Sequence, residues 1–84
     1  MYYVYFAKSL SNGKVYVGST SKNPSVRIGE HNKGYNKWSS HNGPFKLVYY
    51  ESLICKEDAL LREKFFKTGL GKRIKNAIIV EMGG

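Results

Sequence analysis

Two runs rich in strand-forming residues open the chain and predict a β-hairpin. "YYVYFA" at residues 2–7 and "KVYVG" at residues 14–18 consist largely of aromatic and β-branched residues. The segment "SNG" between them contains Asn12-Gly13, a pair that favours a two-residue hairpin turn.

A helix is expected next, with Asn23 as its N-cap, Pro24 at its first position and its end near Gly34. Residues 34–44 have the composition of a loop. They are followed by a third strand, "FKLVYYES", at residues 45–52.

Two further helices complete the predicted pattern. "KEDALLREKFFKT" at residues 56–68 is expected to end at Gly69, and "KRIKNAIIVEM" at residues 72–82 closes the chain. The order ββαβαα predicts a single α+β domain over residues 1–84, in which helices flank a small, mainly antiparallel three-stranded sheet.

Charge adds the first indication of function. Fourteen Lys and Arg residues against six Asp and Glu give a net charge of +8. Nucleic acid is the commonest polyanionic partner of such a domain, although a merely solubilising basic surface is the alternative. No apolar run approaches the roughly 18 residues of a membrane span, and the first residues lack a signal-peptide pattern. The single Cys55 excludes an internal disulfide and the sequence has no zinc-ligand spacing, so a reduced, cytoplasmic protein is expected.

Five polar side chains could converge on one concave surface. With a two-residue turn, Tyr5 and Tyr16 project from the same side of the hairpin. Arg27 and His31 are four residues apart and share one stripe of a helix. Glu63 falls at or near the apolar face of the helix at 56–68.

Each of these residues also has an ordinary structural explanation. Strand tyrosines are usually packing residues, and Arg27 with His31 could form a solvated helix face. Glu63 has Lys67 four residues on, which is the favourable order for a helical ion pair. Taken singly, these explanations are the better ones.

Taken together, the residues carry a resemblance to a known family. The matching segments, in order, are Tyr3-Val4-Tyr5, Tyr16-Val17-Gly18, Gly18-Ser19-Thr20, Arg27 with His31, "GPFKLVYYE" at 43–51, "EDALLREKFFK" with Glu63, and "GKRIKNAI" with Asn76. The chain resembles a GIY-YIG nuclease domain, most closely the small stand-alone branch of the UvrC N-terminal domain and the YhbQ- and Slx1-like proteins. Tyr3 stands where the signature has its first glycine.

The resemblance implies a divalent-metal-dependent endonuclease that hydrolyses DNA phosphodiester bonds with one Mg²⁺ or Mn²⁺ ion. It implies catalytic roles for Tyr5, Tyr16, Arg27 and His31, metal ligation by Glu63, and supporting roles for Gly18 and Asn76. Arg27 offers a planar fork for two phosphate oxygens. The general base is expected to be Tyr5 or Tyr16 with help from His31, and the sequence does not rank them.

Further basic and aromatic residues are candidates for contact with nucleic acid: Lys33, Lys37, Trp38, His41, Lys72, Arg73 and Lys75. Loop anchoring or a solvated helix face explains them as well. We expect single-stranded or distorted DNA as the substrate, and a monomer or weak homodimer with a possible protein partner for targeting. The alternatives are a catalytically inactive nucleic-acid-binding module and a protein-interaction subunit.

Overall fold

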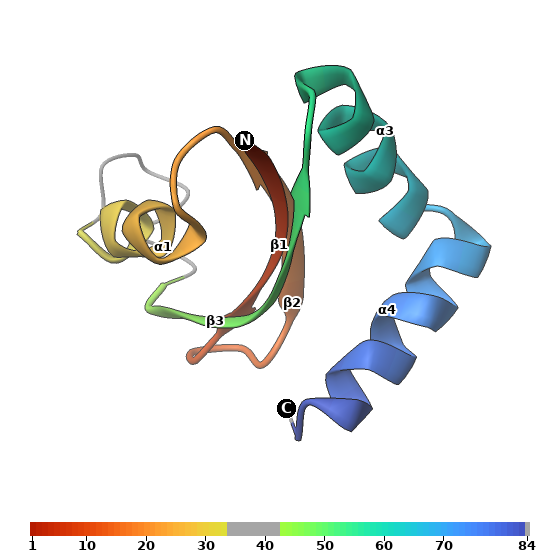
Figure 1. The fold of residues 1–84 in the computed structure, drawn as a ribbon. Helices are drawn as coiled ribbons and strands as arrows, with labels where there is room; N and C mark the ends of the chain where they lie inside the picture. Colours follow the sequence, from red (N-terminus) through yellow and green to blue (C-terminus); the bar gives the residue numbers. More distant parts are fainter. Residues whose placement is uncertain (34–42, 84) are drawn as a thin grey trace.

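The computed structural model describes residues 1–33 and 43–83, and its sheet has the predicted architecture. The central strand β1 (Tyr2–Ser9) pairs antiparallel with β2 (Val15–Thr20) on one side and β3 (Phe45–Leu53) on the other, in the order β2-β1-β3 (Figure 1). With its three helices the element order is ββαβαα, so the predicted α+β fold is confirmed. Because β2 is an edge strand, one side of it is open to partners other than the sheet.

The hairpin between β1 and β2 is longer than a two-residue turn. Residues 10–14 form the loop, which the Ser9 amide closes by donating to the Lys14 carbonyl at 2.8 Å. Gly13 has a φ of +75°, in the region that favours glycine. In this register Tyr5 lies opposite Gly18, two residues from Tyr16, so both tyrosines still project from one face of the sheet.

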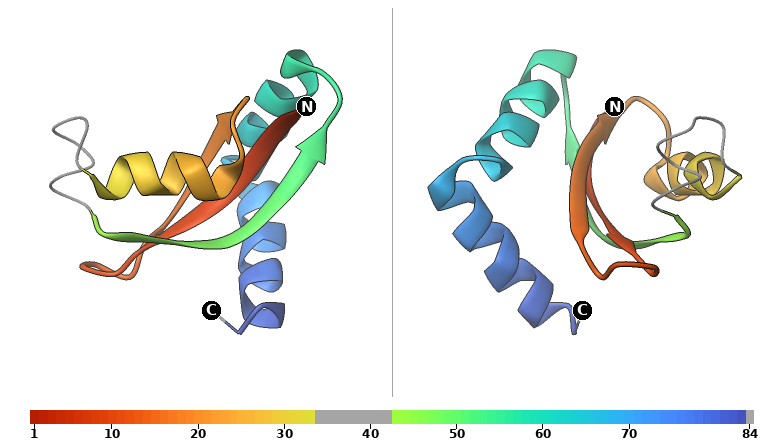
Figure 2. Two further views of the ribbon diagram at one scale, coloured as in Figure 1. Left: turned by 60° about the vertical axis from the view of Figure 1, so that its left-hand side comes forward. Right: turned by 180° about the vertical axis from the view of Figure 1, so that it is seen from behind.

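Helix α1 (Pro24–Asn32) covers that face (Figures 1 and 2). The predicted start is confirmed, because Asn23 is the N-cap, with Oδ1 accepting from the Ser25 amide at 2.9 Å. The helix ends at Asn32, slightly before the predicted position. The Asn32 side chain bonds both the amide and the carbonyl of Phe45, at 2.6 and 2.9 Å, and so fixes the end of α1 to the start of β3.

Helices α3 (Lys56–Phe66) and α4 (Gly69–Glu81) lie on the opposite face (Figure 1). The expectation that Gly69 follows a helix is right, but α4 starts there and not at Lys72. Thr68 provides the cap, since its Oγ1 accepts from the Gly71 amide at 3.1 Å. The chain turns so tightly that a Cβ on Gly71 would collide with the Phe65 carbonyl.

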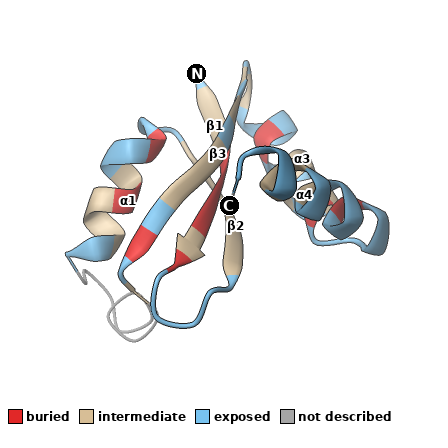
Figure 3. Cartoon of the chain, turned by 90° about the horizontal axis from the view of Figure 1, so that it is seen from below, coloured by how far each residue is buried: buried red, intermediate tan, exposed pale blue. Residues whose placement is uncertain are grey.

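The two faces have separate buried clusters (Figure 3). Tyr5, Ala7, Ile28 and Phe45 are buried beneath α1, and Val4, Phe6, Ala59 and Phe66 are buried beneath α3. Within residues 1–33 and 43–83, none of the helices has the length and apolar character needed to cross a membrane.

Arg62 fixes α3 to the far side of the sheet. Its guanidinium donates to both carboxylate oxygens of Glu51 on β3, at 2.9 and 3.2 Å, and lies 4.4 Å from the Phe66 ring centre. Glu63 follows Arg62 directly and contacts β2, as described below. The helix is therefore attached to both outer strands by adjacent residues.

Candidate active site

A pocket of about 160 Å³ lies on the α1 face and brings together four predicted residues. It is lined by Tyr5, Ala7, Tyr16, Val17, Gly18, His31 and Phe45. Three different elements contribute these side chains, namely the hairpin, α1 and β3. Of the five side chains expected on one concave surface, this pocket brings together Tyr5, Tyr16 and His31, whereas Arg27 and Glu63 do not line it.

Gly18 gives the Tyr5 ring the space that it occupies. A Cβ built on Gly18 would lie 2.5 Å from Tyr5 Oη and 2.6 Å from Cζ, far inside van der Waals contact. The phenol therefore leans from the central strand across Gly18 of the edge strand. Only 6% of Tyr5 is exposed, so its position is set by packing.

His31 lies next to the Tyr5 hydroxyl, with Nε2 3.3 Å from Oη. Burial, reinforced by the positive charge of Arg27, lowers the pKa of His31 below its ordinary value of 6.5. Burial also raises the pKa of the Tyr5 phenol, an effect that the Arg27 charge opposes. At neutral pH the pair is therefore a protonated phenol beside a neutral imidazole.

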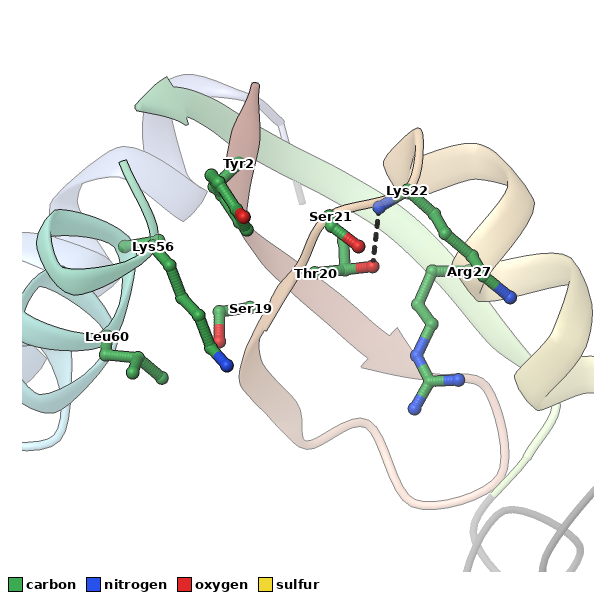
Figure 4. A pocket seen from close by; sticks show the side chains of 9 residues that line it. Tyr2, Ser19, Thr20, Ser21, Lys22, Arg27, Lys56 and Leu60 are labelled. Carbon is green, nitrogen blue, oxygen red and sulfur yellow. Dashed lines mark hydrogen bonds between the residues drawn. The ribbon is translucent and has the colours of Figure 1, made fainter. Parts of the chain in front are cut away.

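Arg27 lines a larger pocket of about 430 Å³ beside the same edge strand (Figure 4). The other residues around it are Tyr2, Ser19, Thr20, Ser21, Lys22, Lys56, Ala59 and Leu60. Glu30 holds Arg27 at 3.3 Å and Lys22 at 2.5 Å, so one carboxylate orients two cations. Seven of the nine lining residues carry a hydroxyl group or a positive charge, a composition suited to phosphate oxygens.

Glu63 approaches the site from the opposite face of the sheet. Its Oε1 accepts from Ser19 Oγ at 2.6 Å, and its Oε2 accepts from Lys67 Nζ at 2.8 Å. Partial burial raises the pKa of Glu63, but the hydrogen bonds from Lys67 and Ser19 outweigh that effect and hold it below its ordinary value. The predicted ion pair with Lys67 is confirmed, and it coexists with the contact to the edge strand.

The two faces meet at the edge strand around Gly18 and Ser19. Burial is the main reason why the pKa of Tyr5 is raised. The negative charge of Glu63 adds to this rise and the positive charge of Lys67 opposes it, so both charges act on the phenol although they belong to α3 and its C-cap. Since successive strand residues alternate between faces, Gly18 faces Tyr5 and Ser19 faces Glu63.

The oxygen atoms at Glu63 suit a hard cation such as Mg²⁺ that has few protein ligands. Among the residues that the structure describes, no group of three or more His, Cys, Asp or Glu side chains could form a closed metal site. Glu63 instead offers one carboxylate with the Ser19 hydroxyl beside it. Mg²⁺ is commonly bound by one or two carboxylates, with waters and phosphate oxygens completing its octahedron.

The other predicted residues lie at varying distances from this centre. Lys72 and Lys75 line a separate pocket between β2 and α4, whereas Arg73 and Asn76 are exposed on the same helix. Lys33 is the exposed C-cap residue of α1. Lys37, Trp38 and His41 lie outside the described residues.

Ser19, Lys22 and Lys56 are among the polar residues of the site that were not predicted as contributors. Ser19 could have been identified from alternation, because the residue after Gly18 must face the helix that carries Glu63. No local signal marks Lys22 or Lys56, since they border the pocket only after α1 and α3 have packed on opposite faces.

Comparison with known protein families identifies one family for most of the chain. The model of the GIY-YIG catalytic domain matches residues 1–76, which is most of the chain. Searches of curated proteins and of solved structures gave no match. GIY-YIG domains are nuclease domains, generally dependent on a divalent metal and acting on DNA. By its sequence match, this chain belongs to the GIY-YIG catalytic-domain family.

Proposed function

We propose that this protein is an endonuclease that hydrolyses phosphodiester bonds of single-stranded or distorted DNA at the edge of β2. The observation that carries the proposal is the meeting of three groups around Gly18 and Ser19: the Tyr5–His31 pair, the Arg27 guanidinium and the Glu63 carboxylate. Packing alone would not require a phenol, an imidazole, a guanidinium and a carboxylate at one strand edge.

Arg27 binds the scissile phosphate in this proposal. Its guanidinium faces the pocket of about 430 Å³ and is oriented by Glu30. A planar fork can donate to two phosphate oxygens, and it stabilises the charge that develops on them. Lys22 and Lys56 add positive charge at the same pocket.

Glu63 and the Ser19 hydroxyl would hold the metal ion. A Mg²⁺ or Mn²⁺ ion bound there would supply Lewis-acid stabilisation of the phosphate and of the leaving oxygen. Lys67 donates to Oε2 of the same carboxylate, so its ammonium would compete with the ion for that oxygen.

Tyr5 and His31 move the proton of the attacking water. The phenol is too weak an acid to be ionised at neutral pH, so it acts as a relay. Oη accepts the water proton while the phenol proton passes to the neutral Nε2 of His31, 3.3 Å away. The new oxygen–phosphorus bond forms as the bond to the leaving oxygen breaks. Tyr16, which accepts a hydrogen bond from Asn12 at 3.3 Å, serves as a wall of the pocket.

Cleavage of end-labelled single-stranded, duplex and flapped DNA, with and without Mg²⁺ or Mn²⁺, tests the function. The wild type is expected to cut with metal, and Glu63→Gln to lose about a hundredfold or more of the rate. Glu57→Gln is the matched control, because it removes an exposed carboxylate from the first turn of the same helix. It should cut like the wild type.

Other outcomes separate the alternatives. If the wild type binds DNA but does not cut any of the three substrates, the chain is a binding module. If Glu63→Gln and Glu57→Gln cut equally well, Glu63 is not the metal ligand. If single-stranded, duplex and flapped DNA are cut at equal rates, the proposed substrate class is wrong.

A further inference from the structure

A third pocket, of about 340 Å³, lies between β2 and α4 and combines an apolar floor with three lysines. Its residues are Val15, Tyr16, Val17, Phe66, Lys67, Lys72 and Lys75. Lys72 and Lys75 are three residues apart, so they project from one stripe of α4. The valines alternate with Tyr16 along the edge strand.

The lysines at this pocket leave much of their positive charge unneutralised. Lys67 pairs with Glu63, but in the part of the chain that the structure describes neither Lys72 nor Lys75 forms an ion pair. Partial burial and the charge of Lys72 together lower the pKa of Lys75. The pocket therefore favours an anion that would relieve this repulsion.

The pocket adjoins the reaction centre. Tyr16 lines both this pocket and the one that contains Tyr5 and His31. Lys67 lines it as well and bonds directly to Glu63. On the other side of Gly18, the pocket with Arg27 continues along the same strand. Sites for negative charge therefore follow one another along the open edge of β2.

We propose that the pocket between β2 and α4 binds the nucleotide next to the cleaved one, in a single strand that runs along the edge of β2. Lys72 and Lys75 contact its phosphate, and Val15 and Val17 contact its sugar or unstacked base. This inference rests on the proposed function, because it takes the cleaved phosphate to lie at Arg27 and Glu63.

The chemistry of the pocket favours a single strand over a duplex. A duplex keeps its bases stacked inside, so none of them can lie against the valines of the pocket. An unpaired strand can place a base or sugar against apolar or aromatic side chains while cations hold its backbone. One open strand edge, flanked by pockets at both ends, accommodates such a path.

Binding in metal-free buffer tests the pocket separately from cleavage. The probe is a fluorescein-labelled oligothymidylate of twelve nucleotides, measured by anisotropy over a series of salt concentrations with EDTA present. The test protein is Lys72→Gln/Lys75→Gln. The control is Lys46→Gln/Lys64→Gln, which removes the same charge from exposed positions on β3 and on α3 outside the pocket. A duplex of equal length is the second probe.

The test protein is expected to bind the single strand about tenfold more weakly than the wild type, with a salt slope smaller by about 0.7, since each phosphate neutralised on a single strand contributes about 0.7. The control should stay within about twofold, because remote charges act only through the screened general field. The loss on the duplex should be smaller than on the single strand.

Equal losses of affinity in the two double variants, or no loss in either, would overturn the proposal that this pocket binds DNA. A loss as large on the duplex as on the single strand would overturn the single-stranded path. If the wild type does not cut DNA but the test protein alone loses binding, the proposed function fails while the pocket stands. If the wild type cuts DNA and both double variants bind it equally well, the proposed function stands and only the proposal about the pocket is wrong.

Discussion

Beneath α3, the buried side chains Val4, Phe6 and Phe66 carry no hydrogen-bonding group, whereas beneath α1 the buried Tyr5 phenol lies 3.3 Å from an imidazole. Both faces belong to the same three strands, and the pleat alone decides which residue faces which helix. One face therefore holds an apolar core, and the other holds a polar group whose surroundings change its pKa.

This small domain therefore separates the residues that stabilise it from those proposed to react across the thickness of one sheet. The separation is incomplete at the edge strand, where Ser19 and Glu63 reach from the α3 face to the site. Substitutions on the α3 face should therefore change mainly stability, and those on the α1 face mainly activity. Substitutions at the edge strand should change both.

Phe66→Ala should give the largest effect, and this effect should be on stability. Phe66 is fully buried, with its ring edge against Phe6 at a centroid distance of 4.9 Å, so its truncation should lower the free energy of unfolding by about 3–5 kcal/mol. Denaturant unfolding measures this. Leu61→Ala, at an exposed position of the same helix, should change it by less than about 0.5 kcal/mol. A change below about 1 kcal/mol for Phe66→Ala would refute the core assignment.

Tyr5→Phe should change activity far more than stability. It keeps the ring over Gly18 but removes the hydroxyl that His31 contacts, so cleavage should slow by about a hundredfold or more. The free energy of unfolding should change by about 1 kcal/mol at most. Tyr50→Phe, at an exposed position on β3, is the control and should leave the rate unchanged. Full activity of Tyr5→Phe would remove the relay from the mechanism.

The sequence predicts the parts of this molecule whose causes are local. Asn23-Pro24 marks the start of α1 because an Asn side chain and a fixed φ act within one turn. The hairpin loop is longer than Asn12-Gly13 indicates, since Ser9 Oγ accepts from the amides of Ser11 and Asn12 and extends the turn. A hydroxyl at a strand end thus outweighs the favoured dipeptide.

The candidate site also has parts that the sequence predicts and parts that it does not. The identities of Tyr5, His31 and Glu63 follow from the family pattern, and the shared face of the tyrosines follows from alternation. The arrangement of the site around the edge of β2 does not follow, because it depends on how α3 is rotated. That rotation is fixed by contacts of adjacent residues to β3 and β2, which are far apart in sequence.

Gly18→Ala should reduce both stability and activity, because Gly18 lies at the edge strand where the two faces meet. The new Cβ would lie 2.5 Å from Tyr5 Oη, so the ring must move away from His31. We expect a loss of about 1–3 kcal/mol in stability and a slower reaction. Gly29→Ala is the matched control, because a Cβ there meets nothing within 4 Å and the residue lies inside α1. It should stabilise the protein by about 0.5–1 kcal/mol.

Activity and stability must be measured on both glycine variants. If Gly18→Ala is as stable and active as Gly29→Ala, the close approach of Tyr5 to the edge strand has no functional weight. If Gly18→Ala lowers stability but leaves activity unchanged, the Tyr5 ring has kept its working position beside the new methyl group.

The pH dependence tests the chemical face more finely. Because the pKa of His31 is lowered, its neutral form persists below the ordinary value of 6.5. The acidic limb of kcat/KM should therefore have its midpoint below pH 6.5, with a fall of about tenfold per pH unit beneath it. His31→Gln should be slower and lose that limb. A midpoint above 6.5 would mean that His31 is not the acceptor.

Lys67→Met gives the smallest expected effect and tests the connection between the faces. Lys67 holds Glu63 Oε2 at 2.8 Å, so its ammonium competes with a cation for that oxygen. Removing a half-exposed ion pair of this kind should tighten Mn²⁺ binding by about two- to fivefold, measured by calorimetry or by the Mn²⁺ resonance signal. Lys64→Met removes a lysine of α3 that does not bond Glu63, and its Mn²⁺ affinity should change less. Weaker binding by Lys67→Met would show that the lysine holds the carboxylate in place for the metal and does not compete with it.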